Sequence, residues 1–159
     1  MYHRQIDDRW NFRDANTKEY THCYHIYPAM MIPQVARTLI KEFRPQGKCD
    51  LLFDPYMGSG TSLVEASLAN IHSVGTDINP LARLISKVKT TFYDVETLKK
   101  EFHEIRDCNV FFSYDRVADR NFDRISNHTY WYSEDVLLRL SYLSQLIKEY
   151  SSNQDFFNV

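Results

Sequence analysis

Glycine and proline are confined to one stretch of this chain, and their distribution constrains the fold more than any other feature. All four glycines and all five prolines lie between Pro28 and Pro80, and neither type occurs from Leu81 to Val159. Tight turns and strand-to-helix loops depend on these residues, whereas helices joined by polar links do not. The sequence therefore predicts a first half with structured loops and a second half that is mostly helical.

Length and composition restrict the class of protein. The chain has 159 residues, which is enough for one domain but not for two full-sized cores. Hydrophobic residues make up 43% and charged residues 25%, values typical of globular proteins and not of disordered ones. No apolar run approaches the roughly 20 residues of a transmembrane helix, and the polar N-terminus does not resemble a signal peptide. We therefore expect a cytoplasmic protein with no membrane partner.

Charge and cysteine usage exclude two further classes. The net charge of −2 argues against a chain that holds nucleic acid by charge alone. Cys23, Cys49 and Cys108 are odd in number and form no CxxC pair, which indicates reduced thiols. His22 and His25 flank Cys23 closely, but no second cluster completes a set of four ligands. We therefore predict no metal site.

Hydrophobic spacing predicts one β-α-β unit in the first half, preceded by a helix. Residues 1–20 form a polar arm, and apolar residues from Ile32 to Phe43 recur at helical spacing until Pro45 and Gly47 end the helix. The elements expected next are a strand over 51–53, a glycine loop, a helix over 61–70, a strand over 72–76 and a helix that begins at Pro80. This order predicts the α/β class.

Helix caps and apolar positions organise the second half. Asp94 and Ser133 are predicted to cap two helices. Their predicted inward residues are Leu98, Phe102 and Ile105 in the first helix and Val136, Leu140, Leu143 and Ile147 in the second. Asp-Arg pairs recur every four residues from 115 to 124 and predict a solvated helix face, with DNA-phosphate contacts as an alternative for the arginines. Aromatic residues from Phe111 to Tyr132 are expected in a core or subunit contact, with base stacking as the alternative.

A glycine loop joins the first predicted strand to the next helix, and an acidic residue ends the second strand. The loop is Asp54-Pro55-Tyr-Met-Gly58-Ser-Gly60-Thr61, and Asp77 follows the second strand. Glycines let the backbone turn tightly and approach a ligand, and the start of the following helix attracts an anion. An acid about 20 residues further on can accept hydrogen bonds from both hydroxyls of a ribose. The pattern predicts a site for a nucleoside-containing ligand.

The amino-acid sequence of the loop restricts the class of ligand that it can bind. A dinucleotide fingerprint requires a third glycine where this chain has Leu63, and a phosphate-binding P-loop requires a lysine after the glycine, where Thr61 follows Gly60. The ligand that fits best carries a carboxylate and a ribose but no pyrophosphate, as S-adenosylmethionine does. The alternative is an ordinary strand-to-helix turn in which Asp77 is a solvated helix cap.

Three segments carry a resemblance to a known family. Asp54 to Ala66 resembles the Asp-Pro-Phe-x-Gly-Ser-Gly-Thr cofactor motif of DNA methyltransferases that modify exocyclic amino groups, at cytosine N4 or adenine N6. Val74 to Ala82 looks like the family's next motif, and His25 to Pro33 is similar to the segment that closes over the methionine end of the cofactor. Lys87 to Thr91 continues the resemblance, which covers residues 22–92.

The resemblance implies a role for each matching position. The residues that would cradle the methionine part of S-adenosylmethionine are Asp54, Gly58, Ser59, Gly60 and Thr61, with Pro55 in the same loop. Asp77 would hold the ribose, and Ile78 and Asn79 would flank the adenine. The implied fold is a partial Rossmann-like methyltransferase sheet, with residues 21–92 as the cofactor-binding region. Residues 93–159 would form a helical docking region.

The family's second motif is missing from this chain. Asp/Asn/Ser-Pro-Pro-Tyr/Phe holds the target amino group and stacks on the extruded base in the family. No Pro-Pro occurs here, and no proline follows Pro80. We therefore predict no catalytic residue in this sequence, which would be one subunit of a split enzyme, the product of an interrupted gene or a fragment. The expected partner is a complementary methyltransferase subunit or a second copy, with DNA as substrate of the assembled enzyme. The expected docking contacts are Leu137, Leu140, Leu143 and Ile147.

Two other functions stay open at this point. An RNA guanine-N2 or related methyltransferase uses a similar Asp-Pro-x-x-Gly-x-Gly-Thr loop. A non-catalytic assembly subunit could retain the loop only as structure. Binding of S-adenosylmethionine would distinguish the enzyme hypotheses from the non-catalytic assembly subunit. A Pro-Pro-Tyr motif beside a DNA-specificity region would favour a DNA methyltransferase over an RNA methyltransferase.

Overall fold

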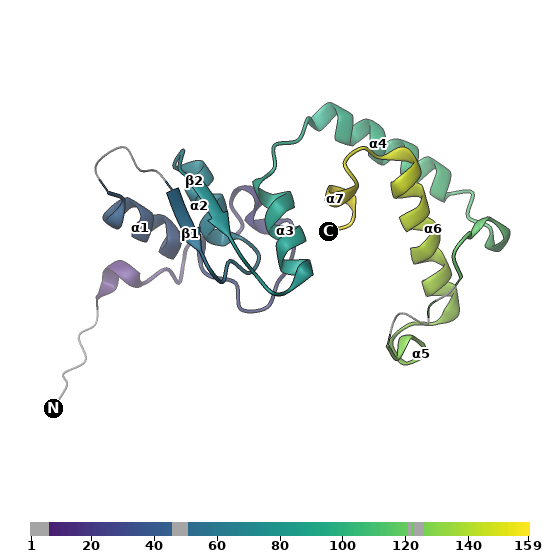
Figure 1. Cartoon of the computed structure of the whole chain (residues 1–159), viewed down its shortest axis with the longest axis horizontal. Coiled ribbons are helices and arrows are strands. Elements are labelled where there is room, and N and C mark those ends of the chain that lie inside the picture. Colours follow the sequence, from purple (N-terminus) through teal and green to yellow (C-terminus); the bar gives the residue numbers. More distant parts are fainter. Residues whose placement is uncertain (1–6, 46–50, 121, 123–125) are drawn as a thin grey trace. The chain divides into compact units, whose positions relative to one another are not determined.

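A computed structural model describes residues 7–45, 51–120, 122 and 126–159, and it divides the chain into two compact units. The first unit extends to Thr91, and the second begins at Phe92. The elements of the first unit are η1 (Asp8–Trp10), η2 (Tyr20–Cys23), α1 (Pro33–Phe43), β1 (Leu51–Asp54), α2 (Thr61–Leu68), β2 (His72–Gly75) and α3 (Pro80–Thr90) (Figure 1). Their order confirms the β-α-β unit with its preceding helix, while residues 1–6 of the predicted arm and Gly47 lie outside the described residues.

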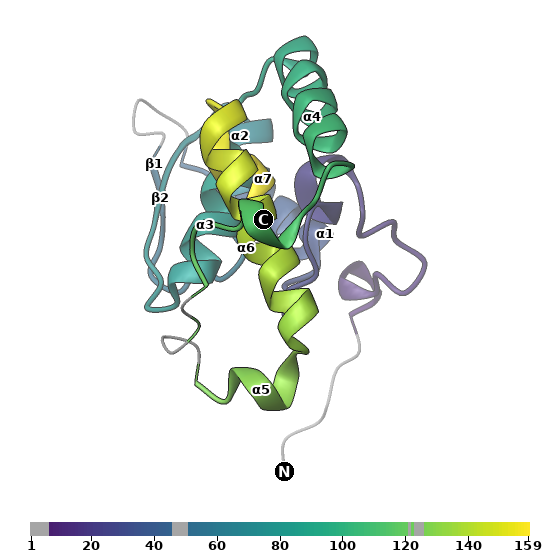
Figure 2. The same ribbon diagram turned by 90° about the vertical axis from the view of Figure 1, so that its right-hand side faces the viewer.

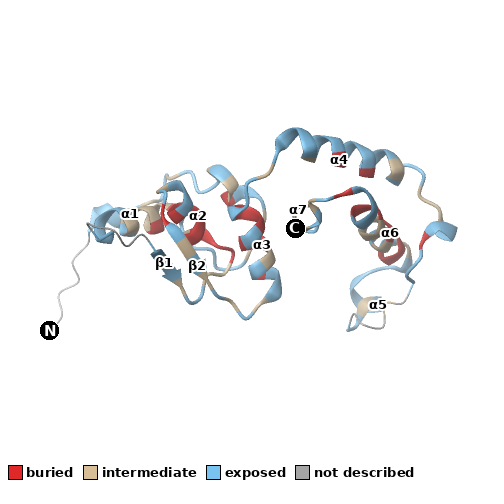
Figure 3. Cartoon of the chain, turned by 45° about the horizontal axis from the view of Figure 1, so that its top comes forward, coloured by how far each residue is buried: buried red, intermediate tan, exposed pale blue. Residues whose placement is uncertain are grey.

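The two strands form a parallel pair that is covered on one face. Leu51 lies opposite His72 and Asp54 opposite Gly75, and the strands run side by side in Figures 1 and 2. The crossover helix α2 packs against both strands. Side chains alternate between the faces of a strand, so Leu51, Phe53 and Val74 share the other face, where they are 60%, 61% and 50% exposed. Figure 3 shows this contrast between the strands and the buried residues of α2.

The core of the first unit is centred on α2. Both α1 and α3 pack against it, and the buried apolar residues are Ala36, Leu63, Val64, Ala66, Ile71, Ala82, Ile85 and Val88. The predicted apolar face of α1 is only partly covered, since Leu39 is 38% and Phe43 69% exposed. These two residues line an apolar groove of about 260 Å³ together with Leu51 and Leu52 of β1. Apolar surface of the first unit therefore remains open at β1.

Local sequence signals set the helix starts. Pro33 and Pro80 occupy the first turns of α1 and α3, where a missing N–H costs no hydrogen bond. The Asn79 side chain caps α3 by accepting the Leu81 N–H at 3.0 Å. In the second unit, Asp94 and Ser133 cap their helices as predicted. These caps confirm the predicted boundaries because they depend on residues within one turn of the chain.

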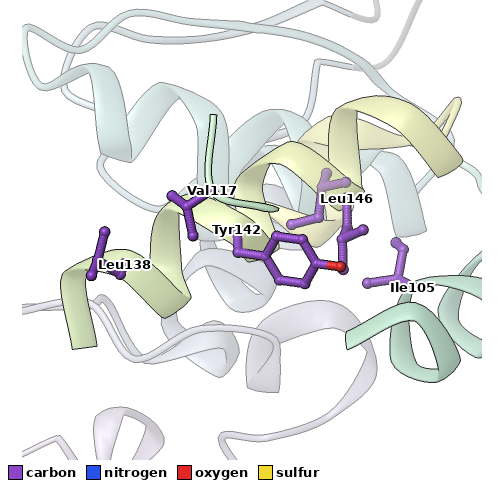
Figure 4. Close-up of a cluster of buried hydrophobic side chains, with 6 residues drawn as sticks. Ile105, Val117, Leu138, Tyr142 and Leu146 are labelled. Carbon is purple, nitrogen blue, oxygen red and sulfur yellow. The ribbon is translucent and has the colours of Figure 1, made fainter. Parts of the chain in front are cut away.

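The second unit is helical and has its own core. Its elements are α4 (Val95–Asn109), η3 (Tyr114–Arg116), α5 (His128–Trp131), α6 (Glu134–Tyr150) and α7 (Gln154–Phe157). α4 packs against α6, and the buried cluster between them consists of Ile105, Val117, Leu138, Tyr142, Leu146 and Ile147 (Figure 4). No helix in the described ranges is long and apolar enough to cross a membrane.

The buried face of α6 differs from the predicted one. Leu138, Tyr142 and Leu146 recur every fourth residue and are buried, whereas Val136 and Leu140 are 39% and 49% exposed. Ile147 is buried and Leu143 packs against the core as predicted, so the prediction is wrong for Val136 and Leu140 only. The helix has apolar residues on more than one face, and helical spacing alone does not choose between them. Of the expected docking contacts, Leu137 and Ile147 are buried and Leu143 packs against the core, which leaves Leu140 exposed.

A buried acid in α4 takes the place of a predicted apolar contact. Phe102 is 52% exposed, while the neighbouring Glu101 is 6% exposed. The Glu101 carboxylate accepts hydrogen bonds from Ser151, Ser152 and Asn153 at 2.6–3.1 Å. Burial raises the pKa of Glu101, but these hydrogen bonds outweigh it and lower the pKa to about 2. Glu101 therefore fastens the segment after α6 to α4.

The predicted helix across the Asp-Arg pairs is wrong for its described part. Only the short η3 forms, and residues 117–120 are not helical. Val117 has an extended backbone and is buried in the core of the second unit. The Arg120 guanidinium donates to the carbonyl oxygens of Tyr114 and Val117. Burial of Val117 thus overrides the four-residue charge repeat, while residues 123–125 lie outside the described residues.

Candidate cofactor site

The glycine loop is fastened to the end of the second strand. The Thr76 N–H donates to the Asp54 carbonyl oxygen at 2.9 Å, and the Met57 N–H donates to the Thr76 carbonyl oxygen at 3.1 Å. The Thr76 hydroxyl donates to the Pro55 carbonyl oxygen at 2.9 Å. These bonds continue the parallel pairing past both strands and place the loop at their carboxyl ends. Ligands of open α/β sheets bind at this edge.

Both loop glycines have a left-handed backbone, but they differ in how closely other atoms surround them. Gly58 has φ +50° and Gly60 φ +80°, which residues with a Cβ disfavour. A Cβ on Gly60 would lie 2.8 Å from the Ser86 Cβ, whereas one on Gly58 would meet only the Tyr27 ring at 3.9 Å. Gly60 therefore allows the loop to pack on α3, a role that the sequence did not predict, and its close approach to a ligand stays a prediction. Gly58 remains the glycine with space beside it.

Asp54 and Asp77 hold the two ends of the loop. Asp54 accepts the Tyr56 N–H at 3.0 Å and the hydroxyl proton of Ser62, so it joins the loop to α2. Asp77 accepts the Gly58 N–H at 3.0 Å with Oδ2 and the Asn79 N–H at 2.8 Å with Oδ1. Each carboxylate oxygen has a second acceptor position. Asp77 can therefore still accept hydrogen bonds from two hydroxyl groups.

The sequence left open that Asp77 is a solvated helix cap, but the residue that caps α3 is Asn79. The Asn79 side chain caps the helix through Oδ1, and its Nδ2 donates to the Tyr27 hydroxyl at 3.1 Å. Tyr27 thus reaches from the Gly58 side of the loop to the start of α3, a contact that the sequence did not predict. Ile78, between the two polar residues, is 98% exposed and free to contact a ligand.

A cavity of about 460 Å³ lies between the segment before α1 and the start of α2. Thr61, the first residue of α2, lines it together with His25 and other residues between Thr17 and Pro33. Gly60 is the N-cap residue, and no side chain in the described part of the chain caps this helix. The His25 Nδ1 atom is buried and has no hydrogen-bond partner among the described residues. An open helix start suits an anionic group such as a carboxylate, and the His25 Nδ1 atom can donate to that group in the tautomer that carries its proton there.

An ionic network centred on a buried carboxylate adjoins the cavity, and one of its members, His22, lines it. Glu65 of α2 is 2% exposed and accepts hydrogen bonds from His22 Nε2 at 2.9 Å and from Arg37 Nε at 2.8 Å. Arg37 also donates to Glu19 at 2.9 Å, and its pKa is raised by Glu65 and then by Glu19. Burial lowers the pKa of His22, although Glu65 opposes this effect. Sequence reasoning assigned no role to these residues; the one signal was an acid, Glu65, inside an apolar helix.

The structure places the predicted site residues in two groups. Asp54, Gly58, Asp77 and Asn79 belong to one hydrogen-bonded loop system, while Thr61 lies at the cavity wall. Ser59 is buried at 4% exposure. Within the ranges that the structure describes, no three His, Cys, Asp or Glu side chains are grouped so that they could hold a metal ion. The loop system offers carboxylate acceptor positions at Asp77, and the cavity offers the start of α2 and the His25 ring nitrogen.

Comparison with known proteins identifies the family. A family profile described as DNA methylase, of the N6/N4 methyltransferase type, matches residues 2–88, which is more than half of the chain. The chain belongs to this DNA methylase family. Methyltransferases of the family generally use S-adenosylmethionine, and the matched range contains the glycine loop and Asp77.

Curated relatives are DNA methylases of greater length. The chain is 41% identical over 148 residues to the type II methyltransferase M.MvaI of Kocuria varians, which covers 87% of this chain and 32% of that protein. It is 40% identical over 82 residues to M.MjaII of Methanocaldococcus jannaschii, 52% of this chain and 15% of that protein. M.BsoBI of Geobacillus stearothermophilus is 31% identical over 93 residues, 57% and 18% of the two chains. This chain therefore spans a third or less of these relatives, and no solved structure matches it.

Proposed function

We propose that this chain is the S-adenosylmethionine-binding portion of a DNA methyltransferase that modifies an exocyclic amino group, at cytosine N4 or adenine N6. The observation that carries the proposal is the loop system of Asp54, Gly58 and Asp77 beside a cavity with an unpaired buried nitrogen, in a member of the DNA methylase family. S-adenosylmethionine supplies an activated methyl group on a sulfonium centre. The residues of this chain bind and orient it.

The residues present fit the parts of this cofactor. The start of α2, with Thr61, and the unpaired His25 nitrogen suit the methionine carboxylate. The unused acceptor positions of Asp77 suit the two ribose hydroxyls, because these groups donate hydrogen bonds. The exposed Ile78 side chain and Asn79 lie next to Asp77 in the chain, where an adenine ring attached to that ribose would lie. Pro55, Gly58, Ser59 and Gly60 shape the loop between these positions.

The proposal also places the methyl-transfer motif outside this sequence. An exocyclic amine is a poor nucleophile and must be held in line with the methyl group, which the family does with a Pro-Pro-aromatic motif that this sequence lacks. The two-stranded sheet leaves Leu51, Phe53 and Val74 exposed, as expected if further polypeptide covers that face. We propose that the motif comes from a complementary methyltransferase subunit or from polypeptide that is missing from this sequence, with DNA as the substrate of the complete enzyme. A second copy of the chain could cover the exposed face but would not supply the motif.

The comparisons do not support the RNA guanine-N2 alternative. The matching family is described as DNA methylase, and the three relatives are type II methyltransferases. A non-catalytic assembly subunit is the alternative that cofactor binding distinguishes from the proposed function.

A methylation assay tests whether methyl transfer needs polypeptide beyond this chain. The purified chain, alone and together with a candidate partner that carries the Pro-Pro-aromatic motif, is incubated with unmethylated DNA and labelled S-adenosylmethionine. We expect no transfer by the chain alone and transfer by the mixture, abolished by Asp77→Ala in this chain. Turnover by this chain alone that is lost in Asp77→Ala would overturn the proposal that the motif lies outside this sequence.

A further inference from the structure

We propose that the hydrogen-bonded network of His22, Glu65 and Arg37, in which His22 and Glu65 are buried, is a clamp that positions the cavity wall, residues 24–32, against α2. These three residues then act as positioning residues for cofactor binding. The inference rests on the proposed function where it concerns the cofactor. The clamp itself is a statement about the ligand-free chain.

The first step is that Glu65 is a fixed, fully paired charge. Its side chain is 1% exposed, and its two oxygens accept three hydrogen bonds at 2.8–2.9 Å from His22 and Arg37. A carboxylate only accepts, so His22 Nε2 is the donor. A buried carboxylate is tolerated when it is paired and hydrogen-bonded in this way. Since Glu65 lies one turn after Thr61 in α2, the network is anchored next to the cavity.

The second step is that Glu65 holds both ends of the cavity wall. His22 belongs to η2, which precedes residues 24–32, and Arg37 belongs to α1, which follows them. Both donate to the same carboxylate. The Thr21 hydroxyl adds a bond from η2 to the Lys89 carbonyl oxygen of α3 at 2.9 Å. The ends of the segment are therefore tied to α2 and α3, the two helices that follow the loop and Asp77.

The third step is that the segment has little regular structure to hold it. Residues 24–32 form no helix or strand. Ala29, within the segment, has φ +55° and Tyr20, at the start of η2, has φ +52°, which non-glycine residues disfavour. A segment with such backbone geometry persists when surrounding contacts determine its position. The clamp supplies such contacts at both ends, and its loss should displace His25 and Tyr27 from the site.

The experiment compares an apolar and a polar replacement of His22. His22→Leu removes the donor to Glu65, whereas His22→Gln keeps an amide donor near the same position. His72→Leu, at an exposed position of β2, is the matched control. The first measurement is hydrogen exchange of the amides of residues 24–32 in the ligand-free chain. The second is the dissociation constant of S-adenosylmethionine.

We expect His22→Leu to speed exchange in residues 24–32 selectively and to raise the dissociation constant at least about tenfold. His22→Gln and His72→Leu should stay close to the original chain in both measurements. Adding Glu65→Gln to His22→Leu should cause less further loss than Glu65→Gln alone, because both act on one contact. Should His22→Leu fail to fold, Arg37→Lys decides in its place, since the Arg37 side chain is 42% exposed and the charge is kept.

Two results would overturn the clamp. One is exchange in residues 24–32 that does not change in folded His22→Leu, or that rises equally throughout the first unit. The other is unchanged cofactor affinity in that variant. If the original chain binds no S-adenosylmethionine, the proposed function fails, and the exchange measurement still decides whether the clamp exists.

Discussion

Substitution of Asp77 separates its two roles, in holding the loop and in holding the ligand. Asp77→Ala removes the acceptor of the Gly58 N–H, which joins the loop to the end of β2, and the acceptor of the Asn79 N–H. A hydrogen bond to a charged group contributes about 1.5–3 kcal/mol. We count only the bond to Gly58 toward the expected loss in the free energy of unfolding. The bond to Asn79 is left out because it spans only two residues and forms with the local turn.

The same substitution removes the expected acceptor of the ribose hydroxyls. A further 1.5–3 kcal/mol of binding free energy corresponds to a dissociation constant about ten- to a hundredfold higher. Asp77→Asn keeps one carbonyl oxygen and should fall between the two proteins in both measurements. Asp94→Ala is the control, because it removes a carboxylate that accepts the Thr97 N–H at 2.9 Å in the second unit.

Urea unfolding and calorimetric titration with S-adenosylmethionine measure the two effects on the same variants. Asp94→Ala should lower the free energy of unfolding by about 1 kcal/mol, the usual contribution of a helix cap, without changing the affinity. An unchanged affinity in folded Asp77→Ala would refute the ribose assignment. Equal losses of affinity in the Asp77 and Asp94 variants would show that the measurement reports folding alone.

Three further predictions follow from the packing and the titrating groups. Gly60→Val should unfold or strongly destabilise the chain, whereas Gly58→Ala should cost about 1–2 kcal/mol; comparable melting temperatures would contradict this. The lowered pKa of Glu101, about 2 against 4.5, stabilises the fold above pH 4.5 by up to about 3 kcal/mol and is lost toward pH 2, so Glu101→Gln should flatten that part of the urea-unfolding profile. Burial lowers the pKa of His22, so below about pH 6.5 the unfolded chain binds a proton that the folded chain does not. The free energy of unfolding should therefore decrease as the pH is lowered below about 6.5. A pH profile that is the same in His22→Gln would exclude this source.

The β-α-β unit could be predicted from sequence because its signals are local. A glycine loop after an apolar run, a proline at a helix start and an Asn or Asp cap each act within a few residues. Asp54, Gly58 and Asp77 were predicted in the same way, from one motif and the spacing to the next. In the structure their hydrogen bonds belong to the loop at the strand ends, and their role in a ligand site stays a prediction.

Contacts between distant positions could not be predicted in this way. The bond from His22 to Glu65 and the bond from Tyr27 to Asn79 join segments that no local pattern relates. The packing of Gly60 on α3 was missed for the same reason, because its neighbour Ser86 lies in a later helix. In α6, apolar residues on several faces left the buried stripe to be decided by packing against α4.

Equilibrium titration of the purified chain with S-adenosylmethionine tests the central claim most directly. The proposed function predicts saturable binding at one site per chain, displaced by S-adenosylhomocysteine, with no binding of NAD or ATP at the same concentrations. The loop has no third glycine and no P-loop lysine, so only the nucleoside without a pyrophosphate should fit. A folded chain that binds no S-adenosylmethionine would contradict the account and leave the loop as structure alone.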